Sequence, residues 1–284
     1  MHPHAEGPGE KGIIGNLFDG YNRMSMEKLS QLQTTVSIFG VRVDNLDRDA
    51  AMSRIGEFIT SRNGRGARKI FFTNVHSIHL ARQDDTLRSG INHADLVLPD
   101  GSGLKIAGKL LEKTVFENLN GTDFTPVLLG LAEQHGWTVY LYGAEDDIIT
   151  ACDRNLREQY PRLRIVGAQH GYTLTSEQKI ILDDVNEKKP DILLVALGSP
   201  RQELWISQYA SQLNAGVCIA VGGLFDFIAG KHSRAPRWMR SAGIEWLYRF
   251  FQDPKDKADR VFVEIPVFMA VLLTRWLFPR RKKS

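Results

Sequence analysis

Residues 191–197 have the sequence Asp-Ile-Leu-Leu-Val-Ala-Leu, an almost wholly apolar run that ends at Gly198-Ser199-Pro200. A segment with helical periodicity follows at 202–212, and a second apolar run, Val-Cys-Ile-Ala-Val, occupies 217–221. Short apolar runs that are bounded by glycine and joined by a helix are typical of buried strands in a parallel sheet. This strand–helix–strand unit therefore predicts an α/β fold.

The same alternation extends from this unit toward the N-terminus. Further strands are expected at 36–41, 69–74, 95–100, 137–142 and 164–168. Helices are expected at 47–62, 75–82, 86–92, 103–111, 122–135, 146–160 and 176–188. Strands that alternate with helices favour right-handed crossovers and helices on both faces of the sheet. We therefore predict a Rossmann-like, mostly parallel sheet.

The 284 residues divide into three predicted regions. Residues 1–34 form a disordered or loosely packed arm, residues 35–230 the α/β domain, and residues 231–284 a helical appendage. The appendage carries 13 lysines and arginines against 5 acidic residues, whereas the whole chain has a net charge of only +3. A basic end on a slightly acidic body indicates an anionic ligand or surface, although a solvated tail explains the charge equally well.

The end of the appendage has a membrane-like pattern. Residues 261–278 are rich in aliphatic and aromatic side chains, are interrupted by Pro266 and Arg275, and precede Arg280-Arg281-Lys282-Lys283. This run is too short and interrupted for a spanning helix, but it suits a helix that lies in the membrane interface. We predict membrane association through residues 261–284. A helix that packs on the core or on another subunit remains the alternative.

Candidate site residues follow the predicted strands, because ligands of open parallel sheets bind beyond the carboxyl ends of the strands. The polar and glycine residues at these ends are Thr73, Asn74, Asp100, Gly101, Gly103, Gly143, Gly171, Tyr172, Gln202, Glu203, Gly223 and Asp226. Asp100 is the most informative acid among them. It could remove a proton from an acceptor hydroxyl, or it could cap the following helix, and local sequence alone favours the cap.

Other kinds of site are disfavoured. No G-x-G-x-x-G motif follows the first strand, so a dinucleotide-binding fold lacks its phosphate loop. His76 and His79 could share a helix face, but without a third ligand at recognisable spacing a structural pair is favoured over a metal site. Cys152 and Cys218 define no disulfide framework, and residues 1–20 contain no apolar signal-peptide core. We expect neither metal nor cofactor.

The chain resembles the WecG/TagA/CpsF glycosyltransferases, glycosyltransferase family 26, from about residue 36 to residue 260. The resemblance depends on the joint order of four motifs, which are Asp100-Gly101-Ser102-Gly103, Gly121-Thr122-Asp123, residues 198–203 and the block 234–249. It implies inverting, metal-independent transfer of a sugar from a UDP-sugar to a polyprenyl-diphosphate-linked saccharide. It also implies a peripheral protein at the cytoplasmic face of the bacterial inner membrane, in contact with anionic lipids, that serves exopolysaccharide or cell-surface glycopolymer synthesis.

The resemblance also implies residue roles. Asp100 would be the base, with Thr73 and Asn74 beside the transferred sugar. Gly171, Tyr172, Gln202 and Asp226 match positions expected around the nucleotide. The appendage cations that would neutralise phosphate charge are Arg234, Arg237, Arg249, Lys257 and Arg260. An ion pair between Arg249 and Glu245 on one helix face is the alternative for Arg249.

The chain departs from the family pattern at one informative position. Asn118 stands where the family often has arginine before Gly-Thr-Asp, which removes a phosphate or sugar contact and leaves the donor sugar undecided. A rival hypothesis from another class is a non-catalytic scaffold that binds a nucleotide-sugar or a lipid head group within a polysaccharide complex. We expect no nucleic-acid partner, and a homo-oligomer is left open.

Overall fold

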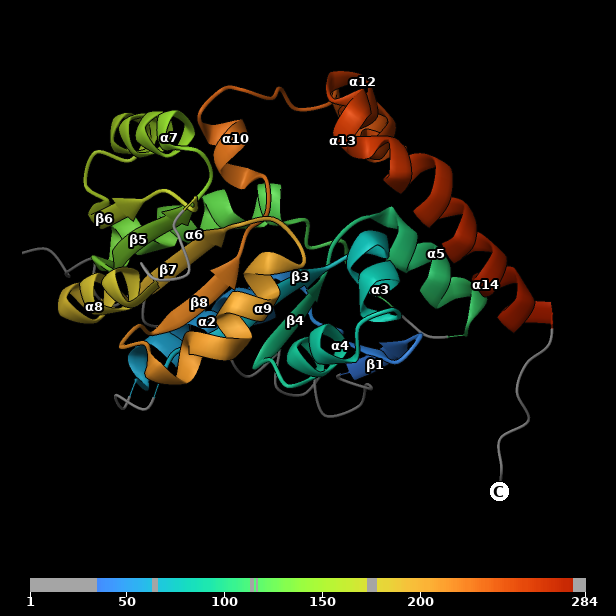
Figure 1. Cartoon of the computed structure of the whole chain (residues 1–284), viewed down its shortest axis with the longest axis horizontal. Coiled ribbons are helices and arrows are strands. Elements are labelled where there is room, and N and C mark those ends of the chain that lie inside the picture. The colour runs from blue at the N-terminus through green and yellow to red at the C-terminus, as the bar shows by residue number, and fades with distance from the viewer. Residues whose placement is uncertain (1–34, 63–65, 113–114, 116, 173–177, 278–284) are drawn as a thin grey trace, which may run out of the picture. The chain divides into compact units, whose positions relative to one another are not determined.

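The computed structural model describes residues 35–62, 66–112, 115, 117–172 and 178–277. The predicted arm 1–34 and the basic residues 280–283 lie outside the described residues. Six parallel strands form the main sheet (Figure 1). They are β3 (Arg68–Thr73), β4 (Leu96–Pro99), β5 (Thr138–Gly143), β6 (Arg164–Gln169), β7 (Ile192–Ala196) and β8 (Val217–Ala220). The predicted parallel α/β sheet is confirmed.

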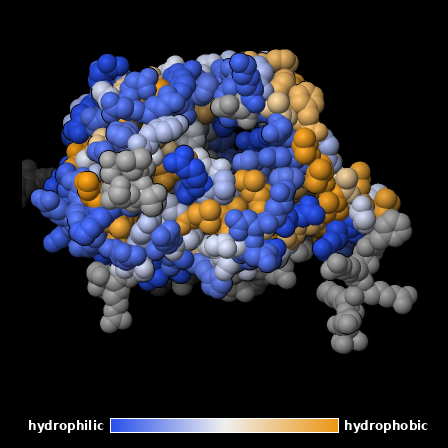
Figure 2. All heavy atoms as spheres, in the orientation of Figure 1, coloured by the Kyte–Doolittle hydropathy of each residue, from blue (hydrophilic) through white to orange (hydrophobic). Residues whose placement is uncertain are grey.

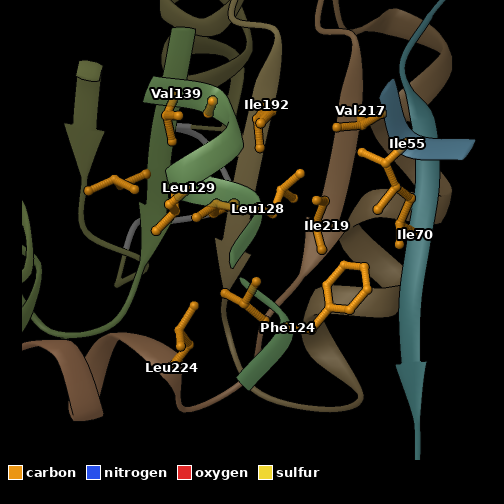
Figure 3. Close-up of a cluster of buried hydrophobic side chains, with 14 of the residues drawn as sticks. Ile55, Ile70, Phe124, Leu128, Leu129, Val139, Ile192, Val217, Ile219 and Leu224 are labelled. Atoms are coloured by element: carbon orange, nitrogen blue, oxygen red, sulfur yellow. The ribbon is translucent and has the colours of Figure 1, made fainter. Parts of the chain in front are cut away.

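The strand order is β4-β3-β8-β7-β5-β6, which places β7 and β8 in the middle of the sheet. Both are buried along their full length, as their continuous apolar sequences predict. Successive side chains of β7 enter two different cores, with Ile192 in one and Leu193 in the other. Figure 3 shows the first core, where Ile192 and Ile219 of the strands lie opposite Phe124 and Leu128 of a covering helix.

Helices cover both faces of the sheet. The first core is completed by α2 (Arg48–Thr60), α6 (Gly121–His135), α7 (Asp146–Gln159) and α10 (Leu224–Ile228). The second core is completed by α3 (Val75–Ala81), α4 (Asp85–Asn92), α5 (Ser102–Leu110), α8 (Gln178–Lys188), α9 (Arg201–Tyr209) and α14 (Ile265–Leu277). The last helix belongs to the C-terminal appendage, so the appendage shares a core with the α/β body.

The first predicted strand is wrong. Residues 36–41 are not one strand but the centre of a hairpin, in which β1 (Thr35–Ile38) pairs antiparallel with β2 (Val41–Asp44). The chain reverses at Phe39 and Gly40, whose φ angles are 51° and 88°. A continuous apolar pattern concealed this turn, because only Gly40 signals the left-handed backbone. The buried carboxylate of Asp44 accepts the Val97 N–H at 2.8 Å and so attaches the hairpin to β4.

The appendage is helical, and no described residue beyond 230 belongs to a strand, as predicted. Its elements are α11 (Arg237–Ser241), α12 (Glu245–Gln252), α13 (Pro254–Asp259), the π-helical turn η3 (Arg260–Glu264) and α14. Within the described part of the chain, no helix combines the length and the apolar character needed to cross a membrane.

Helix α14 has two different faces. Phe268 and Leu272 are buried, and the Phe268 ring lies edge-on to Phe39 at the hairpin turn, with 5.4 Å between ring centroids. Leu273 and Trp276 are exposed at 44% and 53%. Figure 2 shows apolar atoms along the C-terminal helices. One face of the helix is therefore packed on the body, and another face carries exposed apolar side chains.

Candidate active site

A cavity opens where β3 and β4 end and the C-terminal helices cross them. From the α/β body it is lined by Asn74, Asp100, Gly101, Ser102, Asn118 and Asn120. From the appendage it is lined by Arg240, Gly243, Glu245, Trp246, Arg249, Lys257, Arg260 and Val261. The sequence-predicted residues Asn74, Asp100, Gly101, Arg249, Lys257 and Arg260 are thus brought together in one place.

Asp100 does not cap the helix that follows it. The N-cap of α5 is Gly101, at φ 90°, and no side chain caps that helix. The Asp100 carboxylate instead accepts a hydrogen bond from Nδ2 of Asn74, with 3.2 Å between Nδ2 and Oδ2. Burial raises the pKa of Asp100, against the opposing influence of Arg249, of the Asn74 hydrogen bond and of Arg260. A carboxylate with a raised pKa is suited to accept a proton.

Asn74 is held in place by its own helix. It is the N-cap of α3, its Oδ1 accepts the Ser77 N–H at 3.1 Å, and Ser77 reciprocates in a capping box. This use of Oδ1 leaves Nδ2 to face Asp100. A cap that orients one end of the amide toward the helix therefore orients the other end toward the cavity.

Asn118 has a defined structural role. Its Oδ1 accepts the backbone N–H of Gly101 at 2.6 Å, directly after Asp100. The Asn118 amide, at the position where the resemblance led us to expect arginine, thus supports the turn that carries Asp100. It also lines the cavity, which the sequence pattern alone did not predict.

Cations from the appendage surround Asp100. Arg249 and Arg260 act on it electrostatically, and burial lowers the pKa of the Arg260 guanidinium, in opposition to the nearby carboxylates Asp100 and Glu264. Arg249 pairs with Glu245 at 2.9 Å, as its helix spacing predicts, and its guanidinium also lies 4.9 Å from the ring centroid of Phe227. A cluster of arginines and lysine around one cavity is suited to bind diphosphate.

Arg240 was missed from the sequence, whereas Arg237 was expected. Arg237 is exposed and does not line the cavity, while Arg240, three residues later on α11, does. Arg234 also lies outside the lining, where it contacts Asp123 and Glu245. The sequence could have distinguished the cavity-lining Arg240 from the exposed Arg237 only if the rotation of α11 about its axis had been known in advance.

Thr73 and Gly103 lie behind the cavity wall. Thr73 is fully buried, its hydroxyl has no hydrogen-bond partner among the described residues, and its carbonyl accepts the Asp100 N–H at 2.8 Å. A Cβ on Gly103 would lie 2.5 Å from Cγ2 of Val75. Both residues therefore shape the backbone near Asp100 and do not line its cavity.

The remaining predicted residues gather near the ends of β5, β7 and β8. Oε1 of Gln202 accepts the Gly222 N–H at 3.0 Å, and its Nε2 donates to Glu203 at 2.9 Å. Burial raises the pKa of Glu203, and its Oε2 has no partner among the described residues. A Cβ on Gly171 would lie 2.9 Å from Cα of Gly143, so these loops need glycine to approach.

Three residues that were expected to bind the nucleotide-sugar differ in exposure and in their contacts. Tyr172 is 65% exposed. Gly223 caps α10, and Asp226 on that helix lies 3.8 Å from Nζ of Lys231. None of the residues in this second group lines the Asp100 cavity. They line the same edge of the sheet, which is where the nucleotide was expected.

His76 and His79, the two histidines considered as possible metal ligands, bond to different partners within the described residues. Nδ1 of His76 lies 2.7 Å from Oε2 of Glu264, and Nε2 of His79 lies 2.6 Å from Nε2 of Gln83. In the described ranges, no group of three or more His, Cys, Asp or Glu side chains is arranged to hold a metal ion. His76 instead connects α3 to the appendage.

Comparisons with known proteins identify the family of this chain. The family model described as "Glycosyl transferase WecG/TagA/CpsF family" matches residues 36–282. Similar proteins from three bacteria share the name N-acetylglucosaminyldiphosphoundecaprenol N-acetyl-beta-D-mannosaminyltransferase. The Bacillus subtilis (strain 168) protein is 32% identical over 164 residues, which span 58% of this chain and 63% of that protein. The Bacillus spizizenii protein is 31% identical over 68% of this chain and 74% of its own length. The Staphylococcus aureus (strain MW2) protein is 28% identical over 87% and 94%.

Proposed function

The chain belongs to the WecG/TagA/CpsF family of glycosyl transferases, and we propose that it transfers N-acetylmannosamine from a UDP-linked donor to N-acetylglucosaminyl-diphospho-undecaprenol. The names of its relatives support this sugar and this acceptor. The observation that carries the proposal is the cavity in which the half-buried carboxylate of Asp100 lies among Arg249, Lys257 and Arg260. That arrangement combines a base with a diphosphate-binding surface.

Asp100 is the base in this proposal. It takes the proton from the acceptor hydroxyl while that oxygen forms a bond to the anomeric carbon of the donor sugar. The bond from the anomeric carbon to the phosphate oxygen breaks, and its electron pair leaves with UDP. Attack opposite the leaving group inverts the anomeric centre. The raised pKa of Asp100 makes its carboxylate a stronger base than an exposed aspartate.

The appendage cations stabilise the departing diphosphate. Negative charge grows on the UDP oxygens as the glycosidic bond breaks, and preorganised donors lower the energy of that transition state. Arg249, Lys257 and Arg260 supply such donors in the same cavity as Asp100. We propose that they do the work that a divalent metal does in other transferases. Activity in the presence of EDTA is the expected result.

The lipid-linked acceptor places the reaction near a membrane, and the exposed face of α14 supports a peripheral attachment. Leu273, Trp276 and Leu277 are exposed apolar side chains on that face. The sequence adds four basic residues directly beyond the described helix, at 280–283. Apolar side chains followed in the sequence by basic residues favour the interface of an anionic bilayer. We propose the cytoplasmic face of the inner membrane as the site of action.

Transfer is tested with the full chain, UDP-N-acetylmannosamine and N-acetylglucosaminyl-diphospho-undecaprenol in vesicles, by measuring UDP release and the lipid-linked product. Asp100→Asn should reduce the rate by about 10²–10⁴-fold, the usual contribution of a general base. UDP binding should persist in that variant. Asp183→Asn, which changes an exposed aspartate of α8, is the control and should retain activity.

Two outcomes would contradict the proposal. Undiminished transfer by Asp100→Asn would exclude Asp100 as the base. UDP binding by the unaltered chain without any turnover, across a panel of UDP-sugars, would favour the non-catalytic scaffold.

A further inference from the structure

The motif Gly121-Thr122-Asp123 opens helix α6 beside the cavity, and the proposed chemistry assigns it no role. Asn120 caps this helix by accepting the Thr122 N–H at 2.8 Å. A Cβ on Gly121 would lie 3.2 Å from the ring of Phe72, so the helix start is packed closely on β3. The motif is therefore a rigid part of the α/β body.

Asp123 holds two arginines of the appendage. Its Oδ1 lies 2.9 Å from Nη1 of Arg234, and its Oδ2 accepts from Nη2 of the same guanidinium at 3.1 Å. Nη1 of Arg240 lies 3.5 Å from Oδ1 of Asp123. The carbonyl of Thr122 also accepts from Nη1 of Arg234 at 3.2 Å. A forked carboxylate–arginine contact of this kind fixes direction as well as distance.

The same network reaches the cavity through Arg249. Oγ1 of Thr122 accepts from Nη2 of Arg249 at 3.3 Å. Oε1 of Glu245 lies 2.9 Å from Nη2 of Arg249 and 3.4 Å from Nε of Arg234. Arg249 is thus connected to Asp123 through Glu245 and Arg234, and it lies in the cavity that contains Asp100.

We infer that Thr122 and Asp123 are positioning residues that hold the arginine-bearing helices α11 and α12 over Asp100. This inference rests on the proposed function for its kinetic consequence, but its geometry does not depend on it. Asp123 is 44% exposed, and a single exposed ion pair would contribute little. Here the Asp123 carboxylate contacts the guanidiniums of Arg234 and Arg240, and Glu245 connects Arg234 to the guanidinium of Arg249. Without the Asp123 carboxylate, only Glu245 would remain in this network to offset the charges of the three guanidiniums.

Asp123→Asn is the perturbation that tests the inference, and Asp146→Asn is its matched control. Asp146 also lies in the first turn of a helix, α7, and it forms no ion pair with the described residues of the appendage. Both substitutions remove a first-turn acid that favours a helix N-terminus. Only the first removes a partner of the appendage arginines.

Hydrogen exchange of the backbone amides in residues 237–252 reports the geometry without any substrate. We expect faster exchange there in Asp123→Asn and in Arg234→Gln, which breaks the same pair from the other side, and no change in Asp146→Asn. Asp123→Glu keeps the charge and should restore part of the protection. Unchanged exchange in both Asp123→Asn and Arg234→Gln would overturn the inference.

The kinetic arm asks whether Asp123 acts through Arg249. Loss of one hydrogen-bond donor to the transition state reduces kcat by about 10²–10³-fold. We therefore expect Arg249→Ala to reduce kcat by a factor in that range. Asp123→Asn should reduce kcat by less, with the KM for the acceptor unchanged. The double variant should be no slower than Arg249→Ala, because both changes remove the same guanidinium from the site. A double variant whose loss of kcat equals the product of the two single losses would contradict the inference. Absence of transfer by the unaltered chain would instead reject the proposed function and leave the exchange result intact.

Discussion

Replacing Glu264 with glutamine should loosen the attachment of the C-terminal helices to the α/β body. Glu264 lies in the π-helical turn η3, is 8% exposed, and accepts from Nδ1 of His76 on α3 at 2.7 Å. The same α3 begins with Asn74, which contacts Asp100, and the same turn begins with Arg260. This contact therefore joins the two elements that carry opposite sides of the cavity.

The size of the effect follows from the kind of hydrogen bond. A bond to a charged group contributes about 1.5–3 kcal/mol, and a neutral bond about 0.5–1.5 kcal/mol. Glutamine retains an acceptor for His76 but removes the charge, so the expected loss is about 1–2 kcal/mol. In a domain of this size each kcal/mol lowers Tm by about 2–4 °C, which gives a decrease of about 2–8 °C.

The burial of His76 at this contact should also make stability depend on pH. Burial lowers the pKa of His76 from its ordinary value of 6.5, against the opposing hydrogen bond and charge of Glu264, while Arg260 and His79 add to the lowering. The unfolded chain therefore binds a proton at this site more readily than the folded chain. The stability that neutral His76 contributes is complete at a pH above the pKa of this histidine in the unfolded chain. It is lost as the pH falls through the lower pKa of His76 in the folded chain.

Thermal unfolding at about pH 7.5 and about pH 5.5 tests this reasoning, across the window set by the histidine pKa. Glu264→Gln should unfold at a lower temperature than the unaltered chain at the higher pH. His76→Gln should lose part of the decrease in Tm on acidification. His93→Gln changes an exposed histidine at the end of α4 that is bonded to Ser89, so it is the control and should behave like the unaltered chain. An unchanged Tm in Glu264→Gln, or an unchanged pH dependence in His76→Gln, would refute the argument.

Two further predictions concern the base and the membrane. Because burial raises the pKa of Asp100, its contribution to stability is complete below the unfolded pKa and is lost as the pH rises through the folded pKa. Asp100→Asn should therefore have a higher Tm than the unaltered chain at about pH 7.5, with a smaller difference near pH 4, and an equal or lower Tm at neutral pH would contradict this. Replacing Leu273 and Trp276 with serine should reduce sedimentation with anionic vesicles, by about tenfold or more for each side chain that enters the bilayer, because full burial of a large apolar side chain contributes about 1.5–3 kcal/mol. Ile180→Ser changes a still more exposed apolar residue on α8 and is the control. Equal binding by all variants would exclude α14 as the attachment.

Truncation near residue 260 would be a poorer test of membrane attachment than these substitutions. The sequence predicts membrane association through residues 261–284, so truncation after about residue 260 is the test that it suggests. In the structure, Phe268 and Leu272 of this segment are buried in the second core, and Glu264 is bonded to His76. Removing them would expose apolar surface of the body and break that contact. Loss of binding could then not be assigned to the membrane face alone.

The order of strands and helices was predictable because it depends on local periodicity. The apolar runs at 191–197 and 217–221 became the central strands β7 and β8, and both are buried on two faces as such runs require. The hairpin at Phe39 and Gly40 was missed, since a two-residue turn leaves an apolar pattern almost unbroken. Periodicity reports which residues are buried, but it reports a reversal of the chain only where a turn residue interrupts it.

Six residues of the cavity were predicted from the sequence, whereas most of the contacts that position them were not. The sequence by itself determined the parallel α/β sheet, the position of Asp100 at the end of a strand, and the basic character of the appendage. Only the tertiary structure decided that Asp100 faces Asn74 and does not cap a helix, and that Asp123 holds Arg234 from more than a hundred residues away. Backbone periodicity and strand-end rules act over a few residues. Hydrogen bonds and ion pairs between distant segments depend on how packed helices are rotated, and the linear pattern does not contain that information.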